Sequence, residues 1–275
     1  MKINFKEKLD LGRKFKLDPI FASKTAEKGS KINIFRINKT RSKSLVAKCK
    51  KQGVKFTGFL MSAIFYSIKD LYIENGLEAP KELCACISIN MRFRYKEPVD
   101  YSSVGYFSGL VPIEVEYPKF GQYENIWTDS KYWDEIIHES TDIESGAIFV
   151  DIFDYELHKE INALFETSDS LEEVCHRMQS TSRWDVFVSN IGTYLCSKKR
   201  QEPKKPFALR EIYYADSLNS SPSRDNSLIY HLGLWNDELM FMNTSDKARI
   251  APHFTDRLMS LLEGLLNQLA DDNTV

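Results

Sequence analysis

The chain has 275 residues, of which 43% are hydrophobic, 28% charged and 12% aromatic, and its formal net charge is −2. This composition is typical of a globular protein with a sizeable core, and it excludes collagen-like, low-complexity and fully disordered chains. The most apolar stretch, residues 59–68, contains two serines and is followed by Lys-Asp, so it is too short for a membrane span. The first 16 residues lack the apolar run of a secretion signal, and we therefore expect a cytoplasmic protein.

The charge is unevenly distributed along the chain. Residues 1–55 contain 17 Lys and Arg against 4 Asp and Glu, and the remaining residues contain 20 against 35. A basic arm can bind nucleic acid or anionic lipid, or it can pack against its own acidic body. The lysines are spread singly, and few aromatic residues are interleaved for base stacking, so we favour the second interpretation and expect no nucleic-acid partner.

The five cysteines form no CxxC pair, and no histidine lies at the spacing of a zinc site. Cys84 and Cys86 are two positions apart in an apolar run, which would place both thiols on one face of a strand. We interpret the cysteines as buried free thiols in a reducing compartment, and we predict neither disulfides nor a bound metal.

Hydrophobic periodicity predicts a helical pair early in the chain. A helical pattern begins near Thr40 and stops at Gly53, a typical C-terminal glycine. Thr57 is expected to cap a second helix that extends to about Tyr72. This helix is apolar almost all round, and must therefore be covered on more than one side. Before the pair, isoleucines within 32–37 indicate one short edge strand.

The rest of the chain alternates between strand and helix patterns. Asn190-Ile-Gly192 is predicted to be a turn, and Asn236-Asp237 a two-residue hairpin turn. The predicted strands are 83–90, 110–115, 184–188, 209–215, 228–234 and 239–243, and the predicted helices are 123–137, 155–165, 170–178 and 252–269. This order predicts an α/β fold of the two-layer α+β type, a mixed sheet flanked by helices. We divide the chain into a basic arm, 1–38, and one domain, 39–275.

The order of several short sequences resembles a known family. They are KCKKQGVKFTGFLMSAIFYSIKDL, ISINMRFR, VGYFSGLVPIEV, VSNIG and YHLGLWNDELMFMNTS. Together they are similar to the C-terminal half of CoA-dependent acyltransferases, in particular alcohol acetyltransferases and the related condensation domains of peptide synthetases. The resemblance covers about residues 40–269 and implies one chloramphenicol-acetyltransferase-like lobe.

The resemblance also implies where the chemistry would lie. Family members have two similar lobes with a channel between them, and the first lobe carries HHxxxDG, whose second histidine is the general base. This chain has no HHxxxDG, so we assign no catalytic residue. The weak candidates are His138, whose HESTD sequence lacks the strand and loop context, and His231 on a predicted strand, where a structural histidine is favoured.

The remaining candidates would line the channel or bind the donor. Asn90 and Arg92 follow the first interior strand, and Ser189 and Asn190 end a later one; each would contact substrate or hold its own loop. Lys198, Lys199 and Arg200 form a basic segment that would meet the phosphates of CoA or remain a solvated surface. Ser180-Thr-Ser182 is similar to an oxyanion-assisting sequence, and Asp216 to a structural aspartate of related enzymes.

Two functions follow from these observations. The first is acyl transfer from acyl-CoA, as a co-substrate and not a tightly bound cofactor, to an alcohol or amine. This chain would then be the second lobe, and a partner lobe would supply the base. The second is a non-catalytic binding protein built on the half-fold, which would dimerise or hold a partner over the exposed face.

Overall fold

The computed structural model describes residues 17, 29–92, 97–100, 108–116, 125–140, 159, 162–163, 165–170, 173, 184–194, 213, 215, 226–247 and 250–272. The strands are β1 (Ser30–Ile37), β2 (Glu82–Asn90), β3 (Ser108–Glu116), β4 (Trp184–Tyr194), β5 (Asn226–Trp235) and β6 (Glu238–Asp246). The long helices are α1 (Lys39–Gln52), α2 (Phe56–Glu74), α3 (Ile126–Ser140) and α6 (Pro252–Asp271). The expected strand at 209–215 lies almost entirely outside the described residues.

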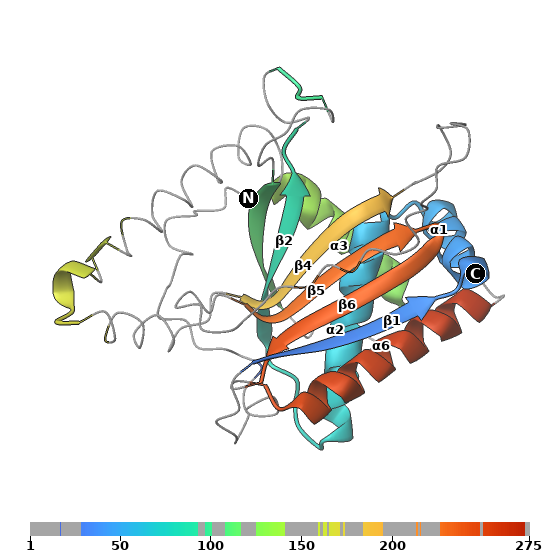
Figure 1. Cartoon of the computed structure of the whole chain (residues 1–275). Helices are drawn as coiled ribbons and strands as arrows, with labels where there is room; N and C mark the ends of the chain where they lie inside the picture. Colours follow the sequence, from blue (N-terminus) through green and yellow to red (C-terminus); the bar gives the residue numbers. More distant parts are fainter. Residues whose placement is uncertain are drawn as a thin grey trace, which may run out of the picture.

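The six strands form one mixed sheet in the order β1-β6-β5-β4-β2-β3 (Figure 1). Strands β2, β4 and β5 are mutually parallel neighbours, while β3 and β6 run antiparallel to the strands beside them. The predicted mixed sheet is therefore confirmed. Residues 30–37, which the sequence groups with the basic arm, form an edge strand of this sheet because β1 pairs with β6 along its whole length.

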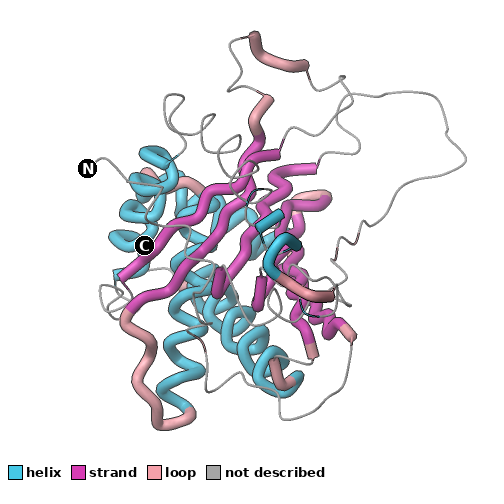
Figure 2. Tube along the Cα trace, turned by 90° about the vertical axis from the view of Figure 1, so that its left-hand side faces the viewer, coloured by secondary structure: helices cyan, strands magenta, loops and turns pink. Residues whose placement is uncertain are grey.

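The four long helices lie together on one face of the sheet (Figures 1 and 2). The apolar side chains of that face alternate along each strand, as Ala85 and Ile87 on β2 and Val186 and Val188 on β4 illustrate. Helix α2 lies at the centre of this layer, between α3 and α6. Its burial on several sides explains why its sequence is apolar nearly all round. None of the described helices combines the length and the apolarity that a membrane crossing requires.

The opposite face of the sheet is also buried over its centre. Cys84 and Cys86 pack there with Trp184 in a second small cluster. The two thiols lie on one face of β2, as predicted, and both are free. Farther along this face, Ile229 and Met242 are almost completely buried. The sheet is therefore an interior layer and not a half-exposed one.

Different residues define where α1 begins, where it ends and where α2 begins. Asn38 begins α1, and its side-chain oxygen accepts a hydrogen bond from the Arg41 amide at 3.0 Å. Gly53 ends α1 with φ 68°, a left-handed conformation that a residue with a Cβ adopts at a cost. The glycine prediction is confirmed. The Thr57 prediction is wrong, because α2 begins at Phe56 and no side chain of its own caps it.

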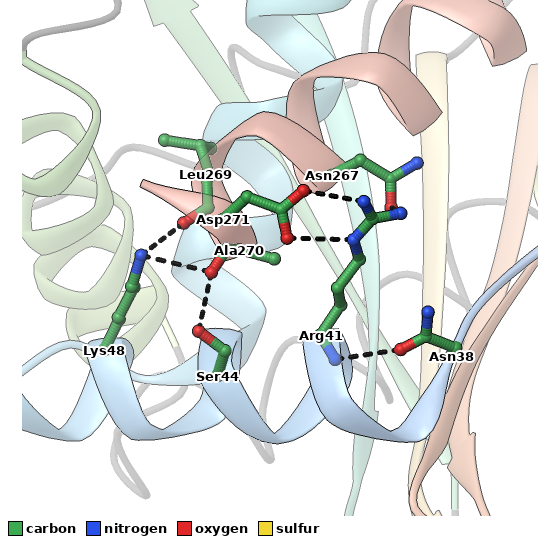
Figure 3. Close-up of polar contacts among 8 residues, drawn as sticks. All are labelled: Asn38, Arg41, Ser44, Lys48, Asn267, Leu269, Ala270 and Asp271. Carbon is green, nitrogen blue, oxygen red and sulfur yellow. Dashed lines mark hydrogen bonds and ion pairs between the residues drawn. The ribbon is translucent and has the colours of Figure 1, made fainter. Parts of the chain in front are cut away.

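Side-chain hydrogen bonds connect α1 to the last turn of α6 (Figure 3). Lys48 of α1 donates to the carbonyl oxygen of Leu269 at 2.7 Å, and the Ser44 hydroxyl donates to that of Ala270 at 2.7 Å. Arg41 Nε donates to Asp271 Oδ1 at 2.9 Å. Lys48 and Ser44 thus satisfy carbonyls that have no partner within the last turn of a helix, and Lys48 and Arg41 place positive charge near the negative end of the helix dipole.

Candidate functional site

The carboxyl ends of β2, β4 and β5 meet at one edge of the sheet, because these three neighbouring strands are parallel. Ligands of open α/β sheets bind at this kind of edge, where strand ends and helix starts bring polar groups together. Of the predicted channel residues, Asn90 is the last residue of β2. The prediction that Ser189 and Asn190 end a strand is wrong: both lie in the middle of β4, which continues to Tyr194. Arg92 follows two residues after β2 ends.

A row of polar side chains crosses the sheet near the end of β2 and through the middle of β4 and β5. Ser88 pairs with Ser189 on the neighbouring strand, and Ser189 pairs with His231 on the next. The Ser88 hydroxyl donates to the Ser189 hydroxyl at 3.0 Å. These residues lie on the face opposite the long helices, where Ser88 and Ser189 are half-buried and His231 is 2% exposed. The structure therefore brings a predicted channel residue and a histidine candidate into one row.

Both the nitrogen and the oxygen of the Asn190 side-chain amide are hydrogen-bonded. Its Nδ2 donates to the hydroxyl oxygen of Thr57 at 2.9 Å, and its Oδ1 accepts from the Gly192 amide at 2.9 Å. The predicted turn at 190–192 is wrong, because β4 continues to Tyr194 with a register shift between Asn190 and Gly192. The local hydrogen bond and the positive φ of Gly192, 81°, produce a bulge and not a chain reversal.

The side chain of Asn90 is hydrogen-bonded to the backbone of Arg92. The Asn90 side-chain oxygen accepts a hydrogen bond from the Arg92 amide at 3.0 Å, as in an Asx turn. Asn90 therefore helps to turn the chain away from the sheet as β2 ends. Asn90 is exposed, and its spacing of two from Ser88 places it on the same face of the sheet as Ser88 and Ser189.

A carboxylate occupies the start of α2, which lies beside β4 because Thr57 in its first turn accepts a hydrogen bond from Asn190. Asp134 of α3 accepts a hydrogen bond from the Lys55 amide, the N-cap position of α2. Burial raises the pKa of the Asp134 carboxyl, and the Lys55 amide and the Lys55 charge oppose the increase. The positive end of the α2 dipole is therefore already balanced by an internal anion, which makes it a poor site for a substrate phosphate.

The other sequence candidates do not lie in this row. His138 is exposed in the last turn of α3. Lys198, Lys199, Arg200, Asp216 and residues 180–182 lie outside the described residues. Within the described ranges, no group of three or more His, Cys, Asp and Glu side chains has the arrangement of a metal site.

Two residues of this site are missing from the sequence candidates. Thr57 is expected only as a helix cap, although its hydroxyl oxygen accepts the Asn190 hydrogen bond. Ser88 lies inside an apolar strand sequence and carries no motif. The one feature of the sequence that points to Ser88 is its spacing of two from Asn90, which places both side chains on the same face of β2.

The sequence matches no protein-family model, and no curated protein matches it. Solved structures do share its fold. A trichothecene 15-O-acetyltransferase from Fusarium sporotrichioides matches with a TM-score of 0.61 and 10% identity over 91% of this chain and 48% of the enzyme. The epimerization domain from the third module of tyrocidine synthetase B matches with a TM-score of 0.58 and 12% identity over 91% of this chain and 51% of the domain.

A third structure, the cyclization-docking bidomain of EpoB from Sorangium cellulosum, has a TM-score of 0.57 and 12% identity, over 90% of this chain and 43% of the bidomain. The chain thus spans about half the length of the structures it resembles. At these identities the similarity concerns the fold. The chain therefore has the mixed-sheet fold that condensation-type domains and acyltransferases share.

Proposed function

We propose that this chain is the second, C-terminal lobe of a CoA-dependent acyltransferase, and that its row of polar side chains lines one wall of the acyl-transfer channel. The observation that carries the proposal is the match of nine-tenths of this chain to about half of an acetyltransferase structure. The row of Ser88, Ser189 and His231, which crosses the sheet near the end of β2, adds the polar groups that such a wall requires.

In the proposed reaction the chain positions an alcohol or amine against an acyl thioester. The acceptor loses its proton to a general base, its oxygen or nitrogen bonds to the carbonyl carbon, and the carbon–sulfur bond breaks. CoA leaves as a thiolate and takes up the proton. Because this sequence lacks HHxxxDG, the base belongs to a partner lobe. Lys198, Lys199 and Arg200 are proposed to contact the phosphates of acyl-CoA.

The role of the Ser189 hydroxyl in this proposal is to orient the acceptor. Its partner Ser88 fixes the hydroxyl at 3.0 Å, and half-burial leaves part of it accessible. His231 is more deeply buried than Ser189, so its proposed role is to hold the Ser189 backbone in place and not to contact the acceptor. Both residues act by positioning, since neither replaces the histidine of the missing motif.

The test begins with the reading frames that flank the coding sequence. The flanking product that contains HHxxxDG is co-expressed with this chain, and release of the CoA thiol from acetyl-CoA is followed with a panel of medium-chain alcohols and amines. We expect acceptor-dependent release by the pair and none by either protein alone. The Ser189→Ala variant is expected to raise the KM for the acceptor. The control Thr40→Ala, which removes an exposed hydroxyl of α1 outside the row, is expected to leave it unchanged.

Two results contradict the proposal. One is the absence of any flanking product with HHxxxDG. The other is a co-expressed pair that neither associates nor releases thiol with any acceptor. Either result favours the second candidate function.

That second candidate is a non-catalytic protein that dimerises through the β1 edge. Ile32 and Ile34 are 48% and 46% exposed on this edge strand, an unusual position for large apolar side chains. Pairing of β1 with the same strand of a second copy would bury both. Light scattering tests this candidate: a dimer that becomes monomeric in an Ile32→Lys, Ile34→Lys variant supports it, and a monomeric unmodified chain contradicts it.

A further inference from the structure

A pocket of about 310 Å³ lies between α1 and the ends of two strands. Its α1 wall consists of residues on one side of the helix, including Lys43, Val46, Ala47 and Lys50. Pockets of this volume are at the lower end of the range that binds small ligands. The wall is apolar at its centre and carries an ammonium group one turn away on either side, because positions 43, 46, 47 and 50 follow the helical period.

The opposite wall belongs to the sheet. Thr193 near the end of β4, Leu234 near the end of β5 and Asp237 in the turn before β6 complete the lining. Asn236 and Asp237 have φ values of 50° and 69°, as a two-residue hairpin turn requires. Asp237 forms an ion pair with Lys39 of α1 at 2.8 Å, which fastens the turn to the helix. The pocket is therefore bounded by elements that are already connected to each other.

The charge around the pocket is unbalanced. Among the described residues of the lining, Asp237 is the one carboxylate, and it forms ion pairs with Lys39 at 2.8 Å and with Lys43 at a longer 3.5 Å. Lys50 forms no ion pair with any residue that the structure describes. Three ammonium groups thus face one carboxylate, and the local field attracts an anion.

The other polar group of the α1 wall is already occupied. Ser42 is completely buried; its hydroxyl donates to the Ile37 carbonyl at 2.8 Å and accepts from the Leu239 amide at 2.9 Å. It therefore holds α1 against β6 and has little capacity left for a ligand. The groups available to a ligand are the ammonium groups of Lys43 and Lys50, the Thr193 hydroxyl, and the apolar side chains of Val46, Ala47 and Leu234.

We propose that this pocket binds a small amphipathic anion. The carboxylate or phosphate head would lie between Lys43 and Lys50, and the aliphatic part would cover Val46 and Leu234. Both head groups share the chemistry that two lysine ammoniums recognise. The proposal does not depend on acyl transfer, since it concerns binding to this chain alone.

Titration calorimetry and amide NMR shifts of the whole chain test the proposal with octanoate, octyl phosphate and neutral 1-octanol as probes. We expect at least one of the two anions to bind with shifts centred on Ala47 and Thr193, and to bind at least tenfold more tightly than octanol. The charge-reversal variant Lys43→Glu, Lys50→Glu is expected to weaken anion binding at least tenfold. Lys51→Glu is the matched control, because Lys51 is exposed on the same helix but does not line the pocket.

A second variant tests the position of the ligand. Ala47 is exposed, so Ala47→Trp fills the pocket without disturbing the core, and we expect it to abolish anion binding while the thermal unfolding transition is preserved. The proposal is overturned if neither anion binds, if octanol binds as tightly as the anions, or if Ala47→Trp leaves anion binding unchanged. Tighter binding of octyl phosphate than of octanoate would identify phosphate as the preferred head group, and the reverse order would identify carboxylate.

Discussion

Asn190 donates a hydrogen bond from its Nδ2 to the Thr57 hydroxyl oxygen at 2.9 Å, although the two residues are 133 positions apart in the sequence. This bond connects the bulge in β4 to the first turn of α2. It therefore links the strand that carries Ser189 to the most deeply buried helix of the protein.

We predict that this bond stabilises the fold measurably. Thr57→Val removes the acceptor and should lower the free energy of unfolding by about 1 kcal/mol, while Thr57→Ser retains a hydroxyl and should cost less. Asn190→Ala also loses the Gly192 bond and should cost about 1–2 kcal/mol. Urea denaturation of the single and double variants measures the coupling. Strictly additive losses would show that the Asn190–Thr57 bond contributes nothing.

A second prediction concerns Gly58 in the first turn of α2. A Cβ added there would lie 2.6 Å from the Ser130 carbonyl oxygen and closer still to the Asp134 carboxylate. Gly58→Ala should therefore destabilise the protein by about 1–3 kcal/mol, because α2 and α3 must separate. Gly264→Ala is the control: Gly264 is exposed within α6, and a Cβ there meets no atom within 4 Å. It should stabilise by about 0.5–1 kcal/mol. Equal effects of the two substitutions in thermal denaturation would contradict the close approach.

The junction between α1 and α6 provides a third prediction. Lys48 donates to the carbonyl oxygens of Leu269 and Ala270 at 2.7 and 3.4 Å (Figure 3). Lys48→Met keeps most of the aliphatic stem but removes the charge, and should reduce stability by about 1 kcal/mol. Lys51→Met, on the same helix, should change stability by less than about 0.5 kcal/mol. Hydrogen exchange of the Asp272 amide, which bonds to the Gln268 carbonyl, should accelerate only in the Lys48 variant. Unchanged exchange would exclude a role of Lys48 in capping α6.

The fourth prediction uses the buried thiol of Cys49. Burial, with a smaller contribution from the Asp134 charge, raises its pKa to about 12. At pH 8 the native thiol is therefore protonated and inert, and iodoacetamide should modify Cys49 only after unfolding in urea. Peptide mass spectrometry measures this difference. Rapid modification of the native chain would contradict the burial of Cys49, which is 2% exposed.

The same pKa has a consequence for stability at alkaline pH. In the unfolded chain a cysteine ionises near pH 8.5, whereas native Cys49 stays protonated until about pH 12. The stabilisation is therefore complete below pH 8.5, and it is lost as the pH rises from there towards 12. Between pH 8.5 and 10 the free energy of unfolding should fall by about 1–2 kcal/mol relative to a Cys49→Ala variant. Parallel curves for the two proteins would contradict this assignment.

Much of the secondary structure was predictable because it depends on neighbours along the chain. The helical period, Gly53 and Asn236-Asp237 predict elements whose bounds the structure reproduces within a few residues. The resemblance to acyltransferases agrees with the fold of the solved structures, because the order of strands and helices is a property of the sequence.

Contacts between distant segments account for the errors. Asn190-Ile-Gly192 has the composition of a turn, yet β5 pairs with β4 on both sides of it and keeps the strand extended. Thr57 has the chemistry of a helix cap, yet the Lys55 amide bonds to Asp134, 79 positions later. A local pattern cannot anticipate a hydrogen bond whose partner is on another element.

The sequence by itself determined the approximate positions of most strands and long helices that the structure describes, which of their faces are apolar, and that no HHxxxDG base is present, since these properties follow from residue type and spacing. The tertiary structure alone decided that Ser88, Ser189 and His231 form one row and that Lys43 and Lys50 face Thr193 and Leu234 across a pocket. Both arrangements depend on strand order and on the packing of α1 against the sheet. Strand order and helix packing minimise the free energy of the whole chain, and no segment encodes them independently.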